Sequence, residues 1–224
     1  MSQIHVEAQL HDHVGTVTLV NPGKRNALPQ SGWLAMQPRF DQLLDDGARV
    51  IVLRGAGDDF CAGADISEFD VVRKNAETAR YYEASNVDAF RAVRECPVPT
   101  IAAITGYCLG GGFGLAAACD LRLASEDAIF AVPAAKLGLG YPVEAMTDIV
   151  GAIGAQNAKR LLYTAKSFSS QDMVSMGFLM DAVPMGDFDQ ACTQLAQTIS
   201  ELAPLTHRAT KAAVAAIASG SAQQ

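Results

Sequence analysis

The chain has 224 residues, of which 50% are hydrophobic, 18% are charged and 7% are aromatic. Its apolar half is rich in alanine, with 38 residues, and this composition is too hydrophobic for a disordered protein and too poor in glycine and proline for a collagen-like one. The formal net charge is −7, and lysine and arginine are scattered along the chain with no cluster larger than a pair, so we do not expect nucleic acid as a partner.

Hydrophobic patterning predicts strands and helices that alternate through the first half of the chain. Residues 14–20 alternate between apolar and polar side chains, and residues 50–54 (VIVLR) are predicted to form a continuous buried run, so both segments are predicted strands. Helices are predicted over 29–44 and 78–94, with Pro29 at the first helical position.

The stretch from Cys96 to Cys119 carries no charge over 24 residues, which is long enough to suggest a transmembrane helix. Its prolines and glycines favour a different structure, because they interrupt helices and mark turns. We therefore predict a strand over 100–105, a turn and a short helix over 112–119, and we expect no membrane span.

The second half of the chain is predicted to be mostly helical. Short strands are predicted over 121–124 and 129–132, helix dominates from Glu144 onward, and a strand-like segment at 179–184 interrupts it. A last helix is predicted over 206–218. The element order predicts an α/β core followed by a helical C-terminal region.

Several classes of site have no sequence signal. The four histidines lie near the N-terminus or in the last helix, so a Ser-His-Asp or Cys-His arrangement has no candidate base. No P-loop, HExxH, CxxC or dinucleotide-binding glycine pattern occurs, and we expect neither a metal nor a nucleotide cofactor. Five cysteines without a CxxC pair, and an N-terminus without an apolar or basic leader, predict reduced thiols in a cytoplasmic protein.

A glycine-rich turn follows the predicted strand over 101–105 and leads into the next helix through residues 106–114. The first backbone N–H groups of a helix have no intrahelical partner and lie at the positive end of the helix dipole. These N–H groups are suited to donating hydrogen bonds to a negatively charged oxygen. A plain strand-to-helix turn would give the same pattern if this segment stood alone.

Four motifs in order give the chain a resemblance to the crotonase superfamily, the enoyl-CoA hydratase and isomerase family. The family's patterns read N-x-x-x-x-N-A-L, F-x-A-G-A-D, G-x-x-x-G-G-G and C-D-x-R. Here they correspond to Asn21–Leu28, Phe60–Asp65, Gly106–Gly112 and Cys119–Arg122, and the resemblance runs from about residue 10 to residue 218. It implies a ClpP-like α/β fold, in which a spiral of ββα units precedes a helical C-terminal region.

The resemblance implies a thioester oxyanion hole made by the backbone N–H groups of Ala64 and Gly111. An enolate of a thioester places negative charge on the carbonyl oxygen, and two preorganised donors stabilise it. The substrate would be an acyl-CoA, with coenzyme A entering as part of the substrate and no separate cofactor. By the same resemblance, the residues that contact coenzyme A are Lys24, Arg25, Ala27, Ala62, Asp65 and Ile66.

The sequence departs from the family at both glutamates that a hydratase uses as acid and base. The first belongs three residues after the second oxyanion glycine, where this chain has Gly114. The second belongs directly after the proline of the F-x-x-P segment, where this chain has Ala134. Ordinary hydration by two glutamates is therefore not expected.

Tyr141 and Glu144 are the candidate replacements, because they lie on the segment that in relatives is near the acyl end of the pocket. Decarboxylation forms the enolate without a base, whereas double-bond isomerisation needs one, which Glu144 could supply. Glu144 also fits a structural role as an acid in the first turn of a helix. A non-catalytic acyl-CoA-binding subunit is the alternative from a different class.

The resemblance also predicts the organisation of the chain. Residues 1–185 would form the core and residues 186–224 a C-terminal helical region that takes part in trimer formation, giving a homotrimer or a dimer of trimers. Relatives continue for some tens of residues past this point, so the chain is either naturally short or truncated.

Overall fold

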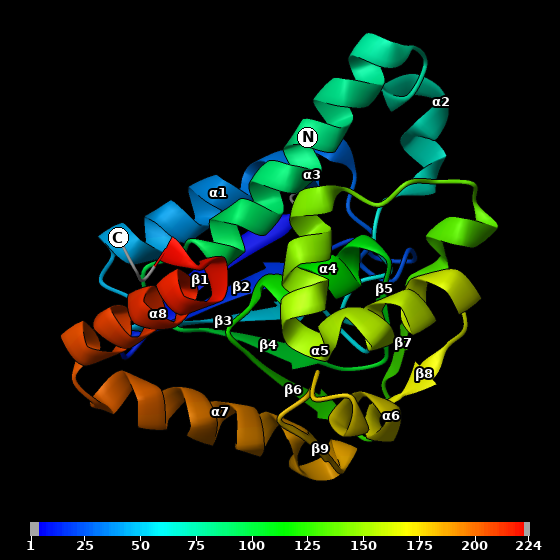
Figure 1. The fold of residues 1–224 in the computed structure, drawn as a ribbon. Helices are drawn as coiled ribbons and strands as arrows, with labels where there is room; N and C mark the ends of the chain where they lie inside the picture. Colours follow the sequence, from blue (N-terminus) through cyan, green and yellow to red (C-terminus); the bar gives the residue numbers. More distant parts are fainter. Residues whose placement is uncertain (1–4, 222–224) are drawn as a thin grey trace.

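The computed structural model describes residues 5–221, which are built around a six-stranded sheet (Figure 1). The first pair of strands is antiparallel and every other neighbouring pair is parallel. In spatial order the strands are β1 (Val6–His11), β2 (Val14–Leu19), β3 (Val50–Gly55), β4 (Thr100–Ile104), β6 (Leu121–Ser125) and β9 (Asp181–Val183).

Both faces of this sheet are covered by helices, which explains why the first four residues of β3, Val50 to Leu53, are all apolar and buried. Helices α1 (Gln30–Asp45) and α3 (Ala76–Arg94) pack together on one side, and α7 (Met185–Glu201) lies against the other (Figure 1). The buried side chains of α7 recur every four residues, as expected for one face of a helix, and are Phe188, Cys192 and Ala196.

A second, smaller sheet contains β5 (Tyr107–Leu109), β7 (Ile129–Ala131) and β8 (Phe168–Ser169). After leaving the large sheet at β4, the chain enters the small sheet at β5 and then forms α4 (Gly111–Ala118). It repeats this order through β6, β7 and α5 (Val143–Thr164). A parallel bridge between Cys61 and Cys108 places the segment after β3 beside β5 in the same way. The chain therefore forms a spiral of ββα units.

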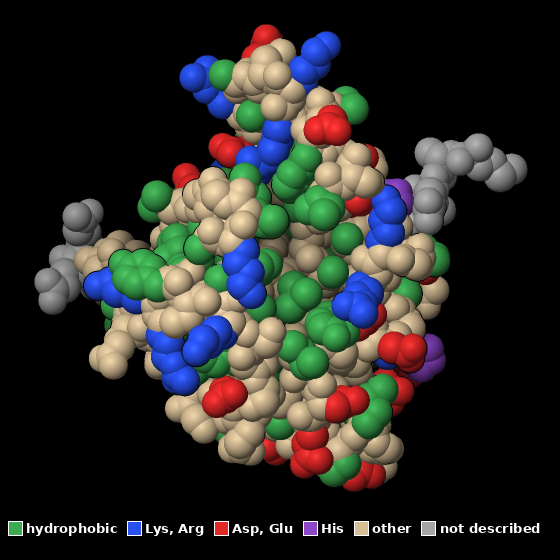
Figure 2. Space-filling view, turned by 90° about the vertical axis from the view of Figure 1, so that its right-hand side faces the viewer, with side chains coloured by type: hydrophobic (Ala, Val, Ile, Leu, Met, Phe, Trp, Pro, Cys, Tyr) green, Lys and Arg blue, Asp and Glu red, His purple; other side chains and the backbone are tan. Residues whose placement is uncertain are grey.

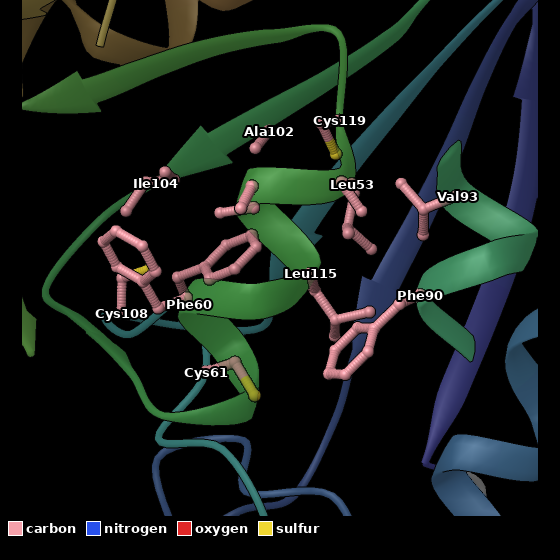
Figure 3. Close-up of a cluster of buried hydrophobic side chains, with 14 of the residues drawn as sticks. Leu53, Phe60, Cys61, Phe90, Val93, Ala102, Ile104, Cys108, Leu115 and Cys119 are labelled. Atoms are coloured by element: carbon pink, nitrogen blue, oxygen red, sulfur yellow. The ribbon is translucent and has the colours of Figure 1, made fainter. Parts of the chain in front are cut away.

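Helix α4 lies in the interior, because all of its residues from Gly112 to Ala118 are buried. In Figure 3, Phe60, Cys61 and Cys108 lie on one side of it, and on the other side Phe90 of α3 approaches Leu115 while Val93 lies near Leu53. Its small residues allow this close packing. A Cβ on Gly112, for example, would lie 2.3 Å from the carbonyl oxygen of Cys61.

The remaining elements connect the spiral or follow it. They are the 3-10 helices η1 (Ile66–Glu68) and η2 (Pro133–Lys136), and helices α2 (Phe69–Val72), α6 (Ser170–Ser175) and α8 (Pro204–Ser219). Lys211 anchors α8 through its Nζ, which lies 2.7 Å from a carboxylate oxygen of Asp120. Within residues 5–221, no helix has both the length and the apolar character needed to cross a membrane.

The predicted strands and helices are found at their expected places, with ends shifted by at most two residues. Pro29 is the residue that precedes α1, and the prediction that it occupies the first helical position is wrong by one residue. Strands β1, β5 and β8 were not predicted, because a strand of two or three residues leaves too short a pattern and β1 contains several polar side chains.

Candidate functional site

A cavity of about 140 Å³ lies between two parts of the chain that are distant in sequence. One wall comes from the loop after β3 and from α2 and α3, and the other from the N-terminus of α4 and the segment between β7 and α5. Figure 2 shows hydrophobic side chains gathered on this face of the molecule, with lysine and arginine around them. The lining residues are Ala62, Ala64, Ile66, Phe69, Arg73, Tyr82, Glu83, Asn86, Phe90, Gly110, Gly111, Val132, Pro133, Ala134, Leu137, Leu139, Gly140, Tyr141 and Pro142.

The first turn of the site is the loop that carries Ala64. Leu28 holds this loop on one side, since its N–H donates to the carbonyl of Gly63 at 2.7 Å and its carbonyl accepts from the N–H of Asp65 at 2.9 Å. The N–H groups of successive residues in extended backbone point in opposite directions, so the N–H of Ala64 points away from Leu28. Among the described residues, nothing accepts a hydrogen bond from it.

Gly63 allows this loop to lie directly against the second turn. Its φ is +93°, in the left-handed region that favours glycine. A Cβ at this position would lie 2.8 Å from the carbonyl oxygen of Leu109 and 2.9 Å from the nitrogen of Gly111. The loop that carries Ala64 therefore lies against the turn that carries Gly111, and both residues line the cavity.

The second turn ends at Gly110, which precedes α4 with φ +50° and ψ −117°, a conformation that favours glycine. Gly111 is the first residue of α4, and within the described part of the chain its N–H has no acceptor. A Cβ on Gly111 would lie 2.8 Å from Cη2 of Trp33, so the indole closes the space behind it. The N–H of Gly111 is left free for a ligand and lies at the positive end of α4.

Tyr141 reaches the cavity from the segment between η2 and α5. Its hydroxyl donates to the carbonyl of Gly110 at 3.0 Å, and burial raises the pKa of its phenol well above the ordinary value. The hydroxyl is therefore a neutral group that can donate a hydrogen bond beside the free N–H of Gly111.

The space that a side chain at position 114 would need is already filled. A Cβ on Gly114 would lie 2.7 Å from the hydroxyl oxygen of Tyr141 and 3.0 Å from two ring carbons of Phe90. Glycine at this position and tyrosine at position 141 thus depend on each other. In the sequence, Gly114 stands where the family has a catalytic glutamate, and Tyr141 is a candidate replacement. The sequence gave no sign that the two residues touch.

Two further predicted positions, Ala134 and Glu144, place no polar side chain in the cavity. Ala134 lines the cavity from η2 and offers no polar atom beyond its backbone. Glu144 is exposed in the first turn of α5 and is not among the residues that line the cavity. The structure therefore brings Tyr141 to the site and leaves Glu144 outside it, and a catalytic role for Glu144 remains an untested prediction.

Lys24 and Asp65, both predicted contacts of coenzyme A, are joined to each other at the cavity rim. The Lys24 Nζ donates to Asp65 at 2.7 Å and to the hydroxyl of Ser67 at 2.8 Å. Burial alone would raise the pKa of the Asp65 carboxyl, but the hydrogen bonds from Lys24 and Ser67 outweigh it and hold the pKa below its ordinary value. Asp65 also accepts from the N–H of Ser67 and so caps η1.

The other four predicted contacts of coenzyme A lie in or near the cavity. Ala62 and Ile66 line the cavity, and the Ile66 side chain is largely exposed. Ala27 is buried beneath the loop. The guanidinium of Arg25 lies 4.0 Å from the ring centroid of Tyr107, which holds this cation on the surface near the rim.

Cys61 lies behind the first turn and stabilises it. Its Sγ donates to the carbonyl of Asn26 and accepts from the N–H of Gly63, at 3.1 and 3.3 Å. Burial raises the pKa of this thiol to about 12, so it is not a thiolate near neutral pH. Residues 5–221 contain no group of three or more side chains arranged to hold a metal ion.

Four polar side chains that line the cavity were missed by the sequence analysis, namely Arg73, Tyr82, Glu83 and Asn86. Together with Phe69 and Phe90 they form the wall contributed by α2 and α3. Tyr82, Asn86 and Phe90 recur every four residues, and this spacing is the signal that could have placed them on one helix face.

Comparison with known proteins places these observations in a family context. The sequence profile described as enoyl-CoA hydratase/isomerase matches residues 9–224. Over 211 residues the chain is 32% identical to the mitochondrial Delta(3,5)-Delta(2,4)-dienoyl-CoA isomerase of Pongo abelii. That match covers 89% of this chain but 64% of the isomerase, so the chain spans less than two thirds of this relative.

Solved structures give the same result for the fold. An enoyl-CoA hydratase/carnithine racemase from Magnetospirillum magneticum superimposes with a TM-score of 0.93 at 33% identity, covering 96% of this chain and 82% of that one. An enoyl-CoA hydratase from Bacillus anthracis superimposes with a TM-score of 0.88 at 30% identity, covering 95% of this chain and 83% of that one. The predicted fold class is confirmed.

Proposed function

The chain belongs to the enoyl-CoA hydratase/isomerase family and has the crotonase fold, and from that premise we propose that it is an enzyme that stabilises the enolate of an acyl-CoA thioester. The thioester oxygen would accept hydrogen bonds from the N–H groups of Ala64 and Gly111. Lys24, Arg25, Ala27, Ala62, Asp65 and Ile66 would contact coenzyme A at the rim.

One observation carries this proposal. Ala64 and Gly111 follow strands of two different ββα units and both line one cavity, and their N–H groups have no acceptor among the described residues. Backbone donors that are fixed before the substrate arrives do not need to reorganise when charge develops on the oxygen, which is why such pairs stabilise enolates.

The reaction we favour does not use two glutamates, because positions 114 and 134 carry no carboxylate. In decarboxylation, loss of CO₂ from a carboxylate at C2 leaves its electron pair as the enolate, and a proton added at C2 completes the product. In isomerisation, a base takes a proton from one carbon and its conjugate acid returns the proton to another, and Glu144 is the predicted candidate for that base. The hydroxyl of Tyr141, held beside Gly110, would donate a proton to the enolate carbon and regain one from water.

A second candidate function is acyl-CoA binding without catalysis. The same absence of carboxylates at positions 114 and 134 favours it, and the two candidates differ in whether any acyl group is turned over. Assembly into a homotrimer or a dimer of trimers is compatible with both.

The test compares two substitutions of the same glycine. Gly111→Ala and Gly111→Pro both place a Cβ against Trp33, but only proline removes the N–H, and proline is tolerated at the first position of a helix. Each variant is assayed with malonyl-, methylmalonyl-, enoyl- and dienoyl-CoA thioesters. We expect kcat/KM for the accepted substrate to be about 10²–10³-fold lower for Gly111→Pro than for Gly111→Ala.

Equal kcat/KM values for the two variants would refute the oxyanion role of Gly111. Fast hydration of crotonyl-CoA by the unmodified protein would refute the claim that the reaction avoids two-glutamate hydration. Binding of acyl-CoA without turnover of any substrate in the panel would favour the non-catalytic candidate.

A further inference from the structure

Three buried polar atoms close to the cavity lack hydrogen-bond partners. They are Nε of Arg73, the hydroxyl of Tyr82 and Nε1 of Trp33. Arg73 and Tyr82 both line the cavity, and Tyr82 is 1% exposed. Two of the three atoms are N–H donors and the third can donate, so each of them can donate to an acceptor supplied by a ligand.

Arg73 is held in a fixed position at this wall. Its guanidinium carbon lies 4.9 Å from the ring centroid of Phe69 and 5.5 Å from that of Tyr82. The contact to Glu83 is loose, because the Nη1 of Arg73 lies 3.7 Å from a carboxylate oxygen that is half exposed. The guanidinium is therefore oriented by aromatic rings, and its Nε is buried without a hydrogen-bond partner.

Tyr82 is placed on the face of α3 that also carries Asn86 and Phe90. Burial raises the pKa of its phenol, with the nearby indole of Trp33 acting in the opposite direction, so the hydroxyl is protonated. The same indole contacts the position of a Cβ on Gly111, and Arg73, Tyr82 and Gly111 all line one cavity.

Buried polar groups without partners destabilise a protein, and a site that keeps several of one kind is suited to a ligand that satisfies them. Nε and one terminal nitrogen of a guanidinium form a fork that matches the two oxygens of a carboxylate. A hydroxyl donor beside that fork adds a third hydrogen bond. A carboxylate would also displace Glu83 from its loose contact.

We propose that Arg73 and Tyr82 bind a carboxylate at the far end of the acyl group, so that the substrates are CoA thioesters of dicarboxylic acids. This inference rests on the proposed function, since it assumes that the thioester lies at Ala64 and Gly111. It assigns specificity to a wall that is separate from the backbone donors.

The experiment measures the dissociation constants of matched thioesters by titration calorimetry. Succinyl-CoA is compared with butyryl-CoA, and glutaryl-CoA with valeryl-CoA, so that each pair has the same number of acyl carbons. We expect the unmodified protein to bind one dicarboxylic thioester about 10–100-fold more tightly than its matched partner. Arg73→Met should abolish this preference, and Tyr82→Phe should reduce it several-fold.

Arg80→Met is the matched control, because Arg80 is an exposed arginine of α3 outside the cavity lining, and it should keep the full preference. Arg73→Lys keeps the charge without Nε and takes the place of Arg73→Met if that variant does not fold. The melting temperature of Tyr82→Phe should be unchanged or higher, because the variant removes an unpaired buried hydroxyl.

Equal binding within both pairs by the unmodified protein would overturn the inference and leave the proposed function intact. Failure to bind any of the four thioesters would refute the proposed function itself. A lowered melting temperature of Tyr82→Phe together with an unchanged preference would also overturn the inference, because it would show that the hydroxyl is structural.

Discussion

Substitution of Gly114 by alanine tests whether the hydroxyl of Tyr141 occupies the space beside α4. The new Cβ would lie 2.7 Å from that hydroxyl and 3.0 Å from the ring of Phe90. Overpacking of this kind typically costs about 1–3 kcal/mol, and loss of the hydrogen bond to Gly110 costs about 1 kcal/mol more. Alanine regains about 1 kcal/mol over glycine in a helix, so the expected destabilisation is about 1–3 kcal/mol.

Tyr141→Phe supplies the second arm of a double-mutant cycle. Alone, it removes the hydrogen bond to Gly110 and should cost about 0.5–1.5 kcal/mol. In the double variant the hydrogen bond is lost only once, and the alanine Cβ no longer meets a hydroxyl. We therefore expect the double variant to be more stable than the sum of the single effects predicts, by at least about 1 kcal/mol.

Urea unfolding of all four proteins, at one protein concentration so that any association is held constant, gives these free energies. Equal dependence of the unfolding free energy on urea across the four would validate the comparison. Additive effects within about 0.5 kcal/mol would refute the reasoning, because residues in contact are coupled and distant residues are not.

Two further predictions concern the loop after β3. Because burial raises the pKa of Cys61 to about 12, iodoacetamide at pH 8 should label Cys61 only after unfolding, and peptide mapping that finds rapid labelling in the folded protein would contradict this placement. Because the pKa of Asp65 is lowered in the folded state, its contact with Lys24 stabilises the fold above the ordinary carboxyl pKa and loses effect as pH falls through the lowered value. Lys24→Met should thus lower the unfolding free energy by about 0.5–1 kcal/mol at pH 7, which is the range for a half-exposed ion pair. Below about pH 4 the same substitution should lower it by progressively less. A cost that is the same at pH 7 and pH 3 would argue against the contact.

The sequence was most informative where local pattern and backbone conformation coincide. The apolar run of β3 and the glycines around Gly63 and Gly111 predicted a buried strand and close turns, and the structure contains both. Glycine is required there by positive φ or by neighbours within 3 Å, so these positions are visible in the sequence itself.

The side chains that line the cavity could not be predicted in the same way, because their positions depend on contacts between residues far apart in the chain. Tyr141 meets Gly114 across 27 positions, and Arg73 meets Tyr82 across the turn between α2 and α3. Strand β5 was missed for a related reason, since a three-residue strand is defined by its partners β7 and Cys61 and hardly by its own pattern.

The contact between Gly114 and Tyr141 also constrains the order in which this site could change during evolution. A carboxylate introduced at position 114 while Tyr141 is present must first displace the phenol, so that path passes through a destabilised protein. Replacement of Tyr141 by a smaller residue removes the shortest of these contacts and leaves those to Phe90, so a later change at position 114 destabilises the protein less. The order of the two substitutions therefore decides how stable the intermediate protein is.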